Sequence, residues 1–173
     1  MARKIVIYGA VIAAVIVAYL ALAHFFIFYE IKTAGLKAPS RQNSYIIGTD
    51  KTMAKNLSYA ALGDSLTAGV GALKYEESYP YLLARTLTDE KKYKISLKIF
   101  SFPGAKTLDL INNLLEPAVA VQPNLVTLLI GVNDVYGNVS AAAFEKNYQY
   151  ILERLTKGTS AKIYLISLPY IGS

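Results

Sequence analysis

The sequence predicts an α/β protein in which a mainly parallel sheet is covered by helices on both faces. Beyond residue 56, short apolar runs of strand length alternate with segments whose apolar residues recur at helical spacing. The connections between these segments are short, which is typical of parallel strands joined through helices. At 173 residues, the chain has room for one such domain with a tail and not for two independent cores.

Four strands are predicted in this region. Residues 57–63 and 125–130 are short, mainly apolar runs, as expected for strands buried on both faces. Residues 93–102 alternate between apolar and polar side chains, which indicates a strand with one solvated face, and residues 162–168 form the fourth strand. The apolar face of the alternating strand carries Ile95, Leu97 and Ile99, and its polar face carries Lys94, Ser96 and Lys98.

Three helices are predicted between these strands. The first covers residues 78–89 behind a Ser-x-Pro start. The second has Thr107 as its N-cap and ends near Pro117 or continues to Val121, and the third follows an N-cap at Ser140. Their apolar faces carry Tyr81, Leu82, Leu83 and Leu87 in the first helix, Leu110, Ile111, Leu114 and Leu115 in the second, and Phe144, Tyr148, Ile151, Leu152 and Leu155 in the third.

An apolar segment precedes the domain. Residues 5–29 run for about 25 residues without a charge, and roughly 20 apolar residues suffice to cross the hydrocarbon core of a bilayer. Arg3 and Lys4 precede the segment, which favours a cytoplasmic N-terminus. We therefore expect residues 1–30 to form a single membrane-spanning anchor and residues 31–56 a linker. The domain at 57–173 would then lie outside the cytoplasm.

Two other interpretations of this segment stay open. Ala21-Leu22-Ala23 has the small-x-small pattern of a signal-peptide cleavage site, so the domain would be secreted after a cut near Ala23. The apolar run continues through His24 to Tyr29, which favours a retained anchor over this cleavage. A buried helix of a soluble protein is the third interpretation.

Charge and composition narrow the function. The net charge is +6, but residues 1–56 hold 7 basic and 2 acidic side chains while residues 57–173 hold 11 and 10. The domain is therefore nearly neutral and shows none of the basic excess of a nucleic-acid binder. The chain contains no cysteine, which excludes disulfides, thiolate metal ligands and a cysteine nucleophile.

Candidate chemistry lies where the predicted strands end, because open parallel sheets bind ligands at the carboxyl ends of their strands. Ser65, in the run Gly-Asp-Ser-Leu-Thr-Ala-Gly, stands at a turn from the first strand into a helix, with its hydroxyl in the crevice. Gly104 follows the second strand and leaves its backbone N–H open to a substrate. Asn133 follows the third strand and its amide donates hydrogen bonds.

The three residues are more informative together than singly. Alone, Ser65 is a helix cap, Gly104 a turn glycine and Asn133 a side chain that bonds local backbone. Together they supply a nucleophile and three donors, namely the N–H groups of Ser65 and Gly104 and the Asn133 amide. Acyl transfer requires such donors because negative charge develops on the carbonyl oxygen, and losing one costs roughly 2.7–4 kcal/mol of transition-state stabilisation.

These motifs resemble those of the SGNH hydrolases, also called GDSL esterases or lipases. Gly-Asp-Ser-Leu at 63–66, Gly104 and Gly-Val-Asn-Asp at 131–134 match the first three blocks of the family. The resemblance implies a flavodoxin-like three-layer α/β/α sandwich, with Ser65 as nucleophile and Gly104 and Asn133 in the oxyanion hole. It also implies supporting roles for Asp64, Gly131 and Asp134. The expected substrates are esters such as lysophospholipid, acylglycerol or acetylated sugar, with neither metal nor cofactor.

One block of the family pattern is missing. An Asp-x-x-His near the C-terminus should supply the general base, and the only histidine is His24, in the apolar segment. We therefore expect a C-terminally truncated copy that is essentially inactive by itself, since an unassisted serine is a weak nucleophile. The alternatives are a non-catalytic binding module and a phosphate-ligand binder. An α/β-hydrolase lipase is disfavoured because Thr67 replaces the second glycine of its nucleophile elbow.

Overall fold

A computed structural model describes residues 19–20, 22–23, 25, 38–39, 43–48 and 55–167. The chain divides into two compact units, Met1–Lys37 and Ala38–Ser173, and the second contains the sheet. Its strands are β1 (Ser44–Ile47), β2 (Lys55–Gly63), β3 (Tyr93–Ser101), β4 (Leu125–Leu129) and β5 (Lys162–Leu165).

The strand order in the sheet is β1-β3-β2-β4-β5. Strands β2 to β5 are mutually parallel, and β1 pairs antiparallel with β3 at the edge. The chain moves from β2 to β3 on one side and then crosses β2 to form β4 on the other side. This reversal is a topological switch point of the flavodoxin-like order, and it opens a crevice at the carboxyl ends of β2 and β4.

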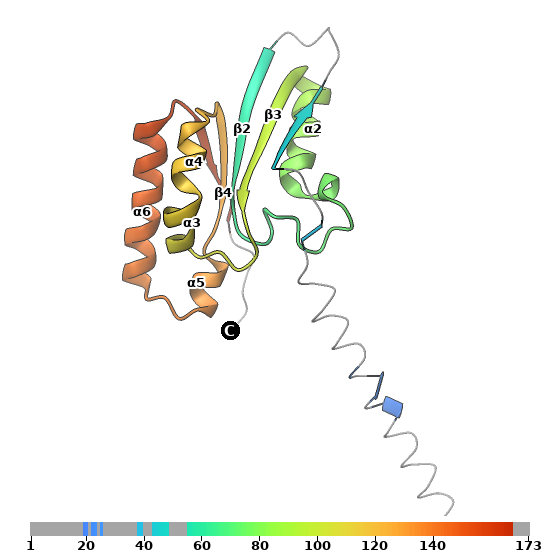
Figure 1. Cartoon of the computed structure of the whole chain (residues 1–173), viewed down its shortest axis with the longest axis vertical. Helices are drawn as coiled ribbons and strands as arrows, with labels where there is room; N and C mark the ends of the chain where they lie inside the picture. Colours follow the sequence, from blue (N-terminus) through green and yellow to red (C-terminus); the bar gives the residue numbers. More distant parts are fainter. Residues whose placement is uncertain are drawn as a thin grey trace, which may run out of the picture. The chain divides into compact units, whose positions relative to one another are not determined.

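Helices cover both faces of the sheet (Figure 1). The helices α3 (Thr107–Asn113), α4 (Leu115–Ala120) and α6 (Ala141–Gly158) lie on one face, and α2 (Tyr79–Lys91) lies on the other. Successive residues of β2 serve the two cores alternately, as the pleat of a strand requires. Ala60 and Leu62 belong to the core under α6, whereas Tyr59 and Ala61 belong to the core under α2. The three-layer α/β/α prediction is confirmed.

The strand predictions are confirmed to within three residues at each end. The buried face of β3 carries Ile95, Leu97 and Ile99, as the alternation predicted. The fourth strand is shorter than expected, since β5 ends at Leu165. The segment predicted as a linker, 31–56, contains β1, which extends the sheet, and the first two residues of β2.

The predicted helix behind Thr107 is two helices. Its chain path changes at Leu114, which has φ −120° and ψ −28°. Pro117 explains the break, because a proline has no N–H to bond the carbonyl four residues earlier and its ring clashes with that carbonyl. Thr107 is the first residue of α3, and Lys106 stands at the N-cap position instead. The N-cap of α6 is Ser140 as predicted, and its hydroxyl accepts a bond from the Ala143 N–H at 3.3 Å.

Most of the predicted membrane anchor lies outside the described residues, and so does His24. In the part of the chain that the structure describes, no helix combines the length and the apolarity needed to cross a bilayer. The anchor therefore stays a prediction.

Candidate active site

The strand register brings the three candidate segments to one edge of the sheet. Gly63, the last residue of β2, pairs with Ser101 of β3 on one side and with Leu129 of β4 on the other. Ser65, Gly104 and Asn133 follow these three strand ends within two to four residues. The expected convergence at the switch point is thus a consequence of β2 lying between β3 and β4.

Ser65 lies in a series of turns after β2, with its side chain half-buried. Its carbonyl accepts a bond from the Val70 N–H at 2.9 Å, and the Asp64 carbonyl accepts one from Ala68 at 2.9 Å. The sequence-based expectation that Ser65 opens a helix is wrong. Gly69 and Gly71 adopt positive φ values of 82° and 93°, which ends the turn series before a regular helix forms.

Gly63 is required where it stands because the backbone is crowded there. A Cβ at this position would collide with Thr67 Oγ1 and with the carbonyl oxygen of Leu129. Thr67 is itself buried, and its hydroxyl shares a 3.0 Å hydrogen bond with that of Tyr79. A glycine before Asp64 and Ser65 therefore lets the serine turn pack directly against the end of β4.

Gly104 lies in an exposed turn between β3 and α3. Its φ of +84° is unfavourable for residues with a Cβ, although an added Cβ would meet no atom within 4 Å. In the described part of the chain, no acceptor bonds the N–H of Gly104 or that of Ser65. Both groups are therefore available to an external acceptor.

Asn133 lies in the first turn of a short helix, α5 (Val132–Tyr136), which the sequence analysis did not predict. Its Nδ2 donates to the Ala105 carbonyl at 3.0 Å. An amide NH₂ has two donors, so this bond turns the side chain toward the Gly104 turn and leaves a second N–H for a ligand. The helix begins after Gly131, whose φ of +130° suits a glycine.

Asp134 joins α5 to the start of α3. The carboxylate is 2% exposed and accepts bonds from the Thr107 N–H at 3.0 and 3.3 Å and from the Thr107 hydroxyl at 2.5 Å. Asn147 of α6 donates to the same hydroxyl at 3.1 Å. The contact ties the segment after β4 to the segment after β3, and so it holds Asn133 beside the Gly104 turn.

Asp64 is the second buried carboxylate at this edge, with an exposed fraction of 1%. One oxygen accepts the Leu66 N–H at 3.0 Å, and the other has no hydrogen-bond partner among the described residues. Burial raises the pKa of Asp64 above its usual value, the Leu66 bond opposes this rise, and the negative charge of Asp134 adds to it. Asp64 therefore caps the serine turn through its bond to the Leu66 N–H, and the supporting role expected for it stays a prediction.

The sequence did not reveal the partners of these residues. The hydrogen bonds of Asp134 to Thr107 span 27 positions, and the Thr67 bond to Tyr79 spans 12. The only sequence signal for the first contact was a threonine at a helix start, which also suits an ordinary N-cap.

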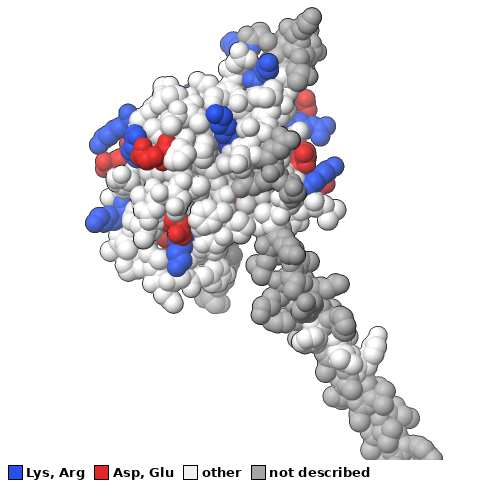
Figure 2. Space-filling view, in the orientation of Figure 1, with Lys and Arg blue, Asp and Glu red and all other residues white. Residues whose placement is uncertain are grey.

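Charged side chains on the face seen in Figure 2 are of both signs and interspersed. Among the described residues, no group of three His, Cys, Asp or Glu side chains is placed to hold a metal ion.

Comparisons with known proteins agree with the motifs. Residues 61–173 match the GDSL-like lipase/acylhydrolase family. The chain is 28% identical over 131 residues to the spore germination lipase LipC of Bacillus licheniformis, in an alignment that covers 65% of the chain and 62% of the relative.

Two crystal structures of esterases are also similar. AlinE4, an SGNH-hydrolase family esterase, superposes with a TM-score of 0.57 at 28% identity, covering 66% of this chain and 60% of AlinE4. The acetyl xylan esterase AlAXEase superposes with a TM-score of 0.50 at 26% identity, covering 63% and 57%.

The chain therefore spans about 60% of the length of these relatives. The match covers both the Ser65 turn and the Asn133 segment, and the fold carries them to the same sheet edge. The chain belongs to the GDSL-like lipase/acylhydrolase family.

Proposed function

We propose that the protein is a carboxylic ester hydrolase in which Ser65 is the nucleophile. The observation that carries the proposal is the register of Gly63 with Ser101 and Leu129, which places the segments of Ser65, Gly104 and Asn133 at one sheet edge. Family membership supports the reaction class.

In the proposed reaction, Ser65 Oγ attacks the ester carbonyl carbon and loses its proton. The carbonyl oxygen becomes negative, and the N–H groups of Ser65 and Gly104 and the second Nδ2–H of Asn133 donate to it. The C–O bond to the alcohol then breaks, the alcohol leaves with a proton, and water hydrolyses the acyl-serine. Asp134 and Thr107 are positioning residues that hold two of the donors together.

The proton acceptor is not a histidine of residues 25–173, which contain none. A carboxylate with an ordinary pKa near 4 is too weak a base at neutral pH to replace an imidazole efficiently. We therefore expect the 173-residue chain by itself to hydrolyse esters very slowly, and added imidazole to act as an external base at Ser65.

The test measures hydrolysis of p-nitrophenyl butyrate by the chain at increasing imidazole concentration. Imidazole also attacks the ester directly, so the Ser65→Ala variant is the control whose rate is subtracted. We expect the wild type to hydrolyse the ester faster than Ser65→Ala, by a difference in rate that grows with imidazole concentration. In Asn133→Ala this difference should be smaller by a factor of roughly 10² to 10³. A wild-type rate equal to that of Ser65→Ala would overturn the proposal and favour a non-catalytic binding module.

We also propose that residues 5–29 tether the domain on the outer side of the cytoplasmic membrane. The support is the length of the uncharged run and the two basic residues before it, Arg3 and Lys4. Protease added to intact cells should then digest the domain. Protection until the cells are lysed would contradict this orientation.

A further inference from the structure

The turn that carries Ser65 is held by few hydrogen bonds of its own. Its internal bonds run from the Ala68 N–H to the Asp64 carbonyl and from the Val70 N–H to the Ser65 carbonyl, and no regular helix follows. Among the described residues, no hydrogen bond holds the Ser65 hydroxyl. The direction of this side chain therefore depends on the contacts that fix the backbone of the turn.

Thr67 is the residue through which the rest of the domain holds this turn. It is fully buried, and its hydroxyl shares a 3.0 Å hydrogen bond with the hydroxyl of Tyr79. Its carbonyl accepts a second bond, at 3.2 Å, from the hydroxyl of Tyr75. Its Oγ1 also fills the space that a Cβ on Gly63 would need. The turn is thus fixed through both the side chain and the main chain of a residue two positions after Ser65.

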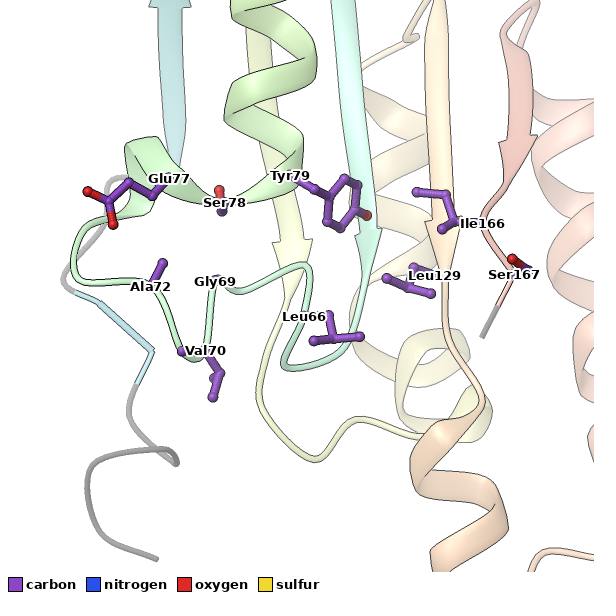
Figure 3. A pocket seen from close by; sticks show the side chains of 11 residues that line it. Leu66, Gly69, Val70, Ala72, Glu77, Ser78, Tyr79, Leu129, Ile166 and Ser167 are labelled. Atoms are coloured by element: carbon purple, nitrogen blue, oxygen red, sulfur yellow. The ribbon is translucent and has the colours of Figure 1, made fainter. Parts of the chain in front are cut away.

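The two tyrosines come from the start of α2 and the short segment before it. The Tyr75 ring stacks on Tyr45 of β1, with the ring centroids 5.3 Å apart. The Ser78 hydroxyl donates to the Tyr75 carbonyl at 2.6 Å, which joins this segment to α2. Figure 3 shows the Tyr79 ring extending from the start of α2 toward the end of β2. Both tyrosines therefore reach the serine turn from a well-packed base.

The hydroxyl of Tyr79 is suited to hold Thr67. Burial raises the pKa of Tyr79 above its usual value, although its bond to Thr67 opposes the rise, so the hydroxyl keeps its proton at neutral pH. A buried hydroxyl such as that of Thr67 needs a partner, because a buried polar group without one is destabilising. A phenylalanine ring would fill the same space and leave Thr67 without this partner.

We infer that the Tyr79 hydroxyl is a positioning group for the nucleophile, because through Thr67 it fixes the turn from which Ser65 projects. The inference rests on the proposed function, since it gives Tyr79 a part in aiming Ser65 at the ester. Tyr79 acts through Thr67 and is not itself a catalytic residue. A misplacement of reacting groups by about 1 Å costs roughly 10²-fold in rate. Loss of the bond should therefore lower the hydrolysis rate while the fold is kept.

The first test measures the imidazole-dependent hydrolysis of p-nitrophenyl butyrate after subtraction of the Ser65→Ala rate. Tyr79→Phe removes only the hydroxyl, and we expect it to lower this rate roughly 10-fold. Thr67→Val removes the partner hydroxyl and should have a similar effect. The double variant should be no slower than the slower single variant, because both substitutions break the same bond. Thr67→Ser keeps the hydroxyl and should retain most of the wild-type rate.

Tyr59→Phe is the matched control. The Tyr59 hydroxyl shares a buried 2.8 Å hydrogen bond with Thr127 of β4, so this variant also loses one bond between a tyrosine and a threonine. Its midpoint in urea unfolding should fall by about as much as that of Tyr79→Phe. Its hydrolysis rate should stay at the wild-type level, because the lost bond does not contact the serine turn.

The second test requires no catalysis. Amide hydrogen exchange is followed by NMR at Ala68 and Val70, whose N–H groups bond within the serine turn. Relative to the amides of β3, their exchange should become roughly fivefold faster in Tyr79→Phe, as expected for the loss of one neutral hydrogen bond. In Tyr59→Phe this ratio should not change.

Equal hydrolysis rates for Tyr79→Phe and the wild type would overturn the inference, and so would unchanged exchange at Ala68 and Val70. A rate loss in Tyr59→Phe as large as that in Tyr79→Phe would also overturn it, because the rate would then follow stability alone. Failure of the proposed function has a different signature. The wild type would then hydrolyse the ester no faster than Ser65→Ala, and the exchange measurement would decide whether Tyr79 holds the turn.

Discussion

Replacement of Asp134 by alanine should destabilise the domain by about 3–5 kcal/mol. The carboxylate is 2% exposed and accepts hydrogen bonds from both the N–H and the hydroxyl of Thr107. A hydrogen bond to a charged group contributes about 1.5–3 kcal/mol, and the buried donors that lose their acceptor add a desolvation cost. The expected loss is therefore a large part of the stability of an ordinary domain.

The loss of free energy is measured by urea unfolding of the whole chain, followed by far-ultraviolet circular dichroism. Thr107→Val removes the hydroxyl and keeps the N–H, so its cost should be smaller, about 1–2 kcal/mol. The double variant should be less destabilised than the sum of the single variants, by about 1 kcal/mol or more, because both substitutions remove the same 2.5 Å bond.

Asp89→Ala is the matched control for loss of an aspartate. Its side chain is 66% exposed and lies 3.6 Å from Arg85 in an exposed pair, and such pairs contribute little to stability. The reasoning is refuted if Asp134→Ala costs less than about 1 kcal/mol, or if the Asp134→Ala and Thr107→Val effects simply add. In that case the segments after β3 and β4 are held together by apolar packing alone.

The remaining predictions concern the two glycines of the site and the buried carboxyl group. Gly104→Ala should cost about 1–2 kcal/mol in thermal or urea unfolding, because the φ of +84° disfavours a Cβ while the space around it is open. Gly63→Ala should destabilise the domain more, by about 2–3 kcal/mol, because its Cβ would collide with the carbonyl oxygen of Leu129. Equal losses of stability in the two glycine variants would show that small shifts of the neighbouring atoms remove this collision. The pKa of Asp64 in the folded protein is above the value of 3.8 expected in the unfolded chain, so the folded protein binds this proton more tightly. Protonated Asp64 therefore stabilises the fold most strongly below pH 3.8. This stabilisation is lost as the pH rises through the pKa of the folded protein. Asp64→Asn should therefore gain stability relative to wild type between pH 4 and pH 7 in urea unfolding, and a difference that does not change with pH would contradict the raised pKa.

The sequence was sufficient for the elements whose signal is local. Alternation in residues 93–101 marked the buried face of β3, and helical spacing behind Ser140 marked α6. The sequence did not predict the break between α3 and α4 at Leu114. Proline is tolerated within the first turn of a helix, so Pro117 was compatible with either one helix or two. The sequence did not predict β1 either. Its four residues have mixed side chains, and they form a strand only because they pair with the edge of β3.

For the candidate site, the sequence determined the chemical groups and the tertiary structure decided their neighbours. Ser65, Gly104 and Asn133 were identified from motifs at strand ends, because a strand end and a short motif are both local features. Their shared edge depends on β2 lying between β3 and β4, which is a property of strand order.

The tertiary structure alone decided the contacts that hold the site. The Asp134 contact with Thr107 and the pairing of Gly63 with Leu129 join residues far apart in the chain. Local patterns report only which face of an element is buried, and many different partners satisfy the same pattern. Which partner is chosen depends on how the layers pack, and that is settled by the whole fold at once.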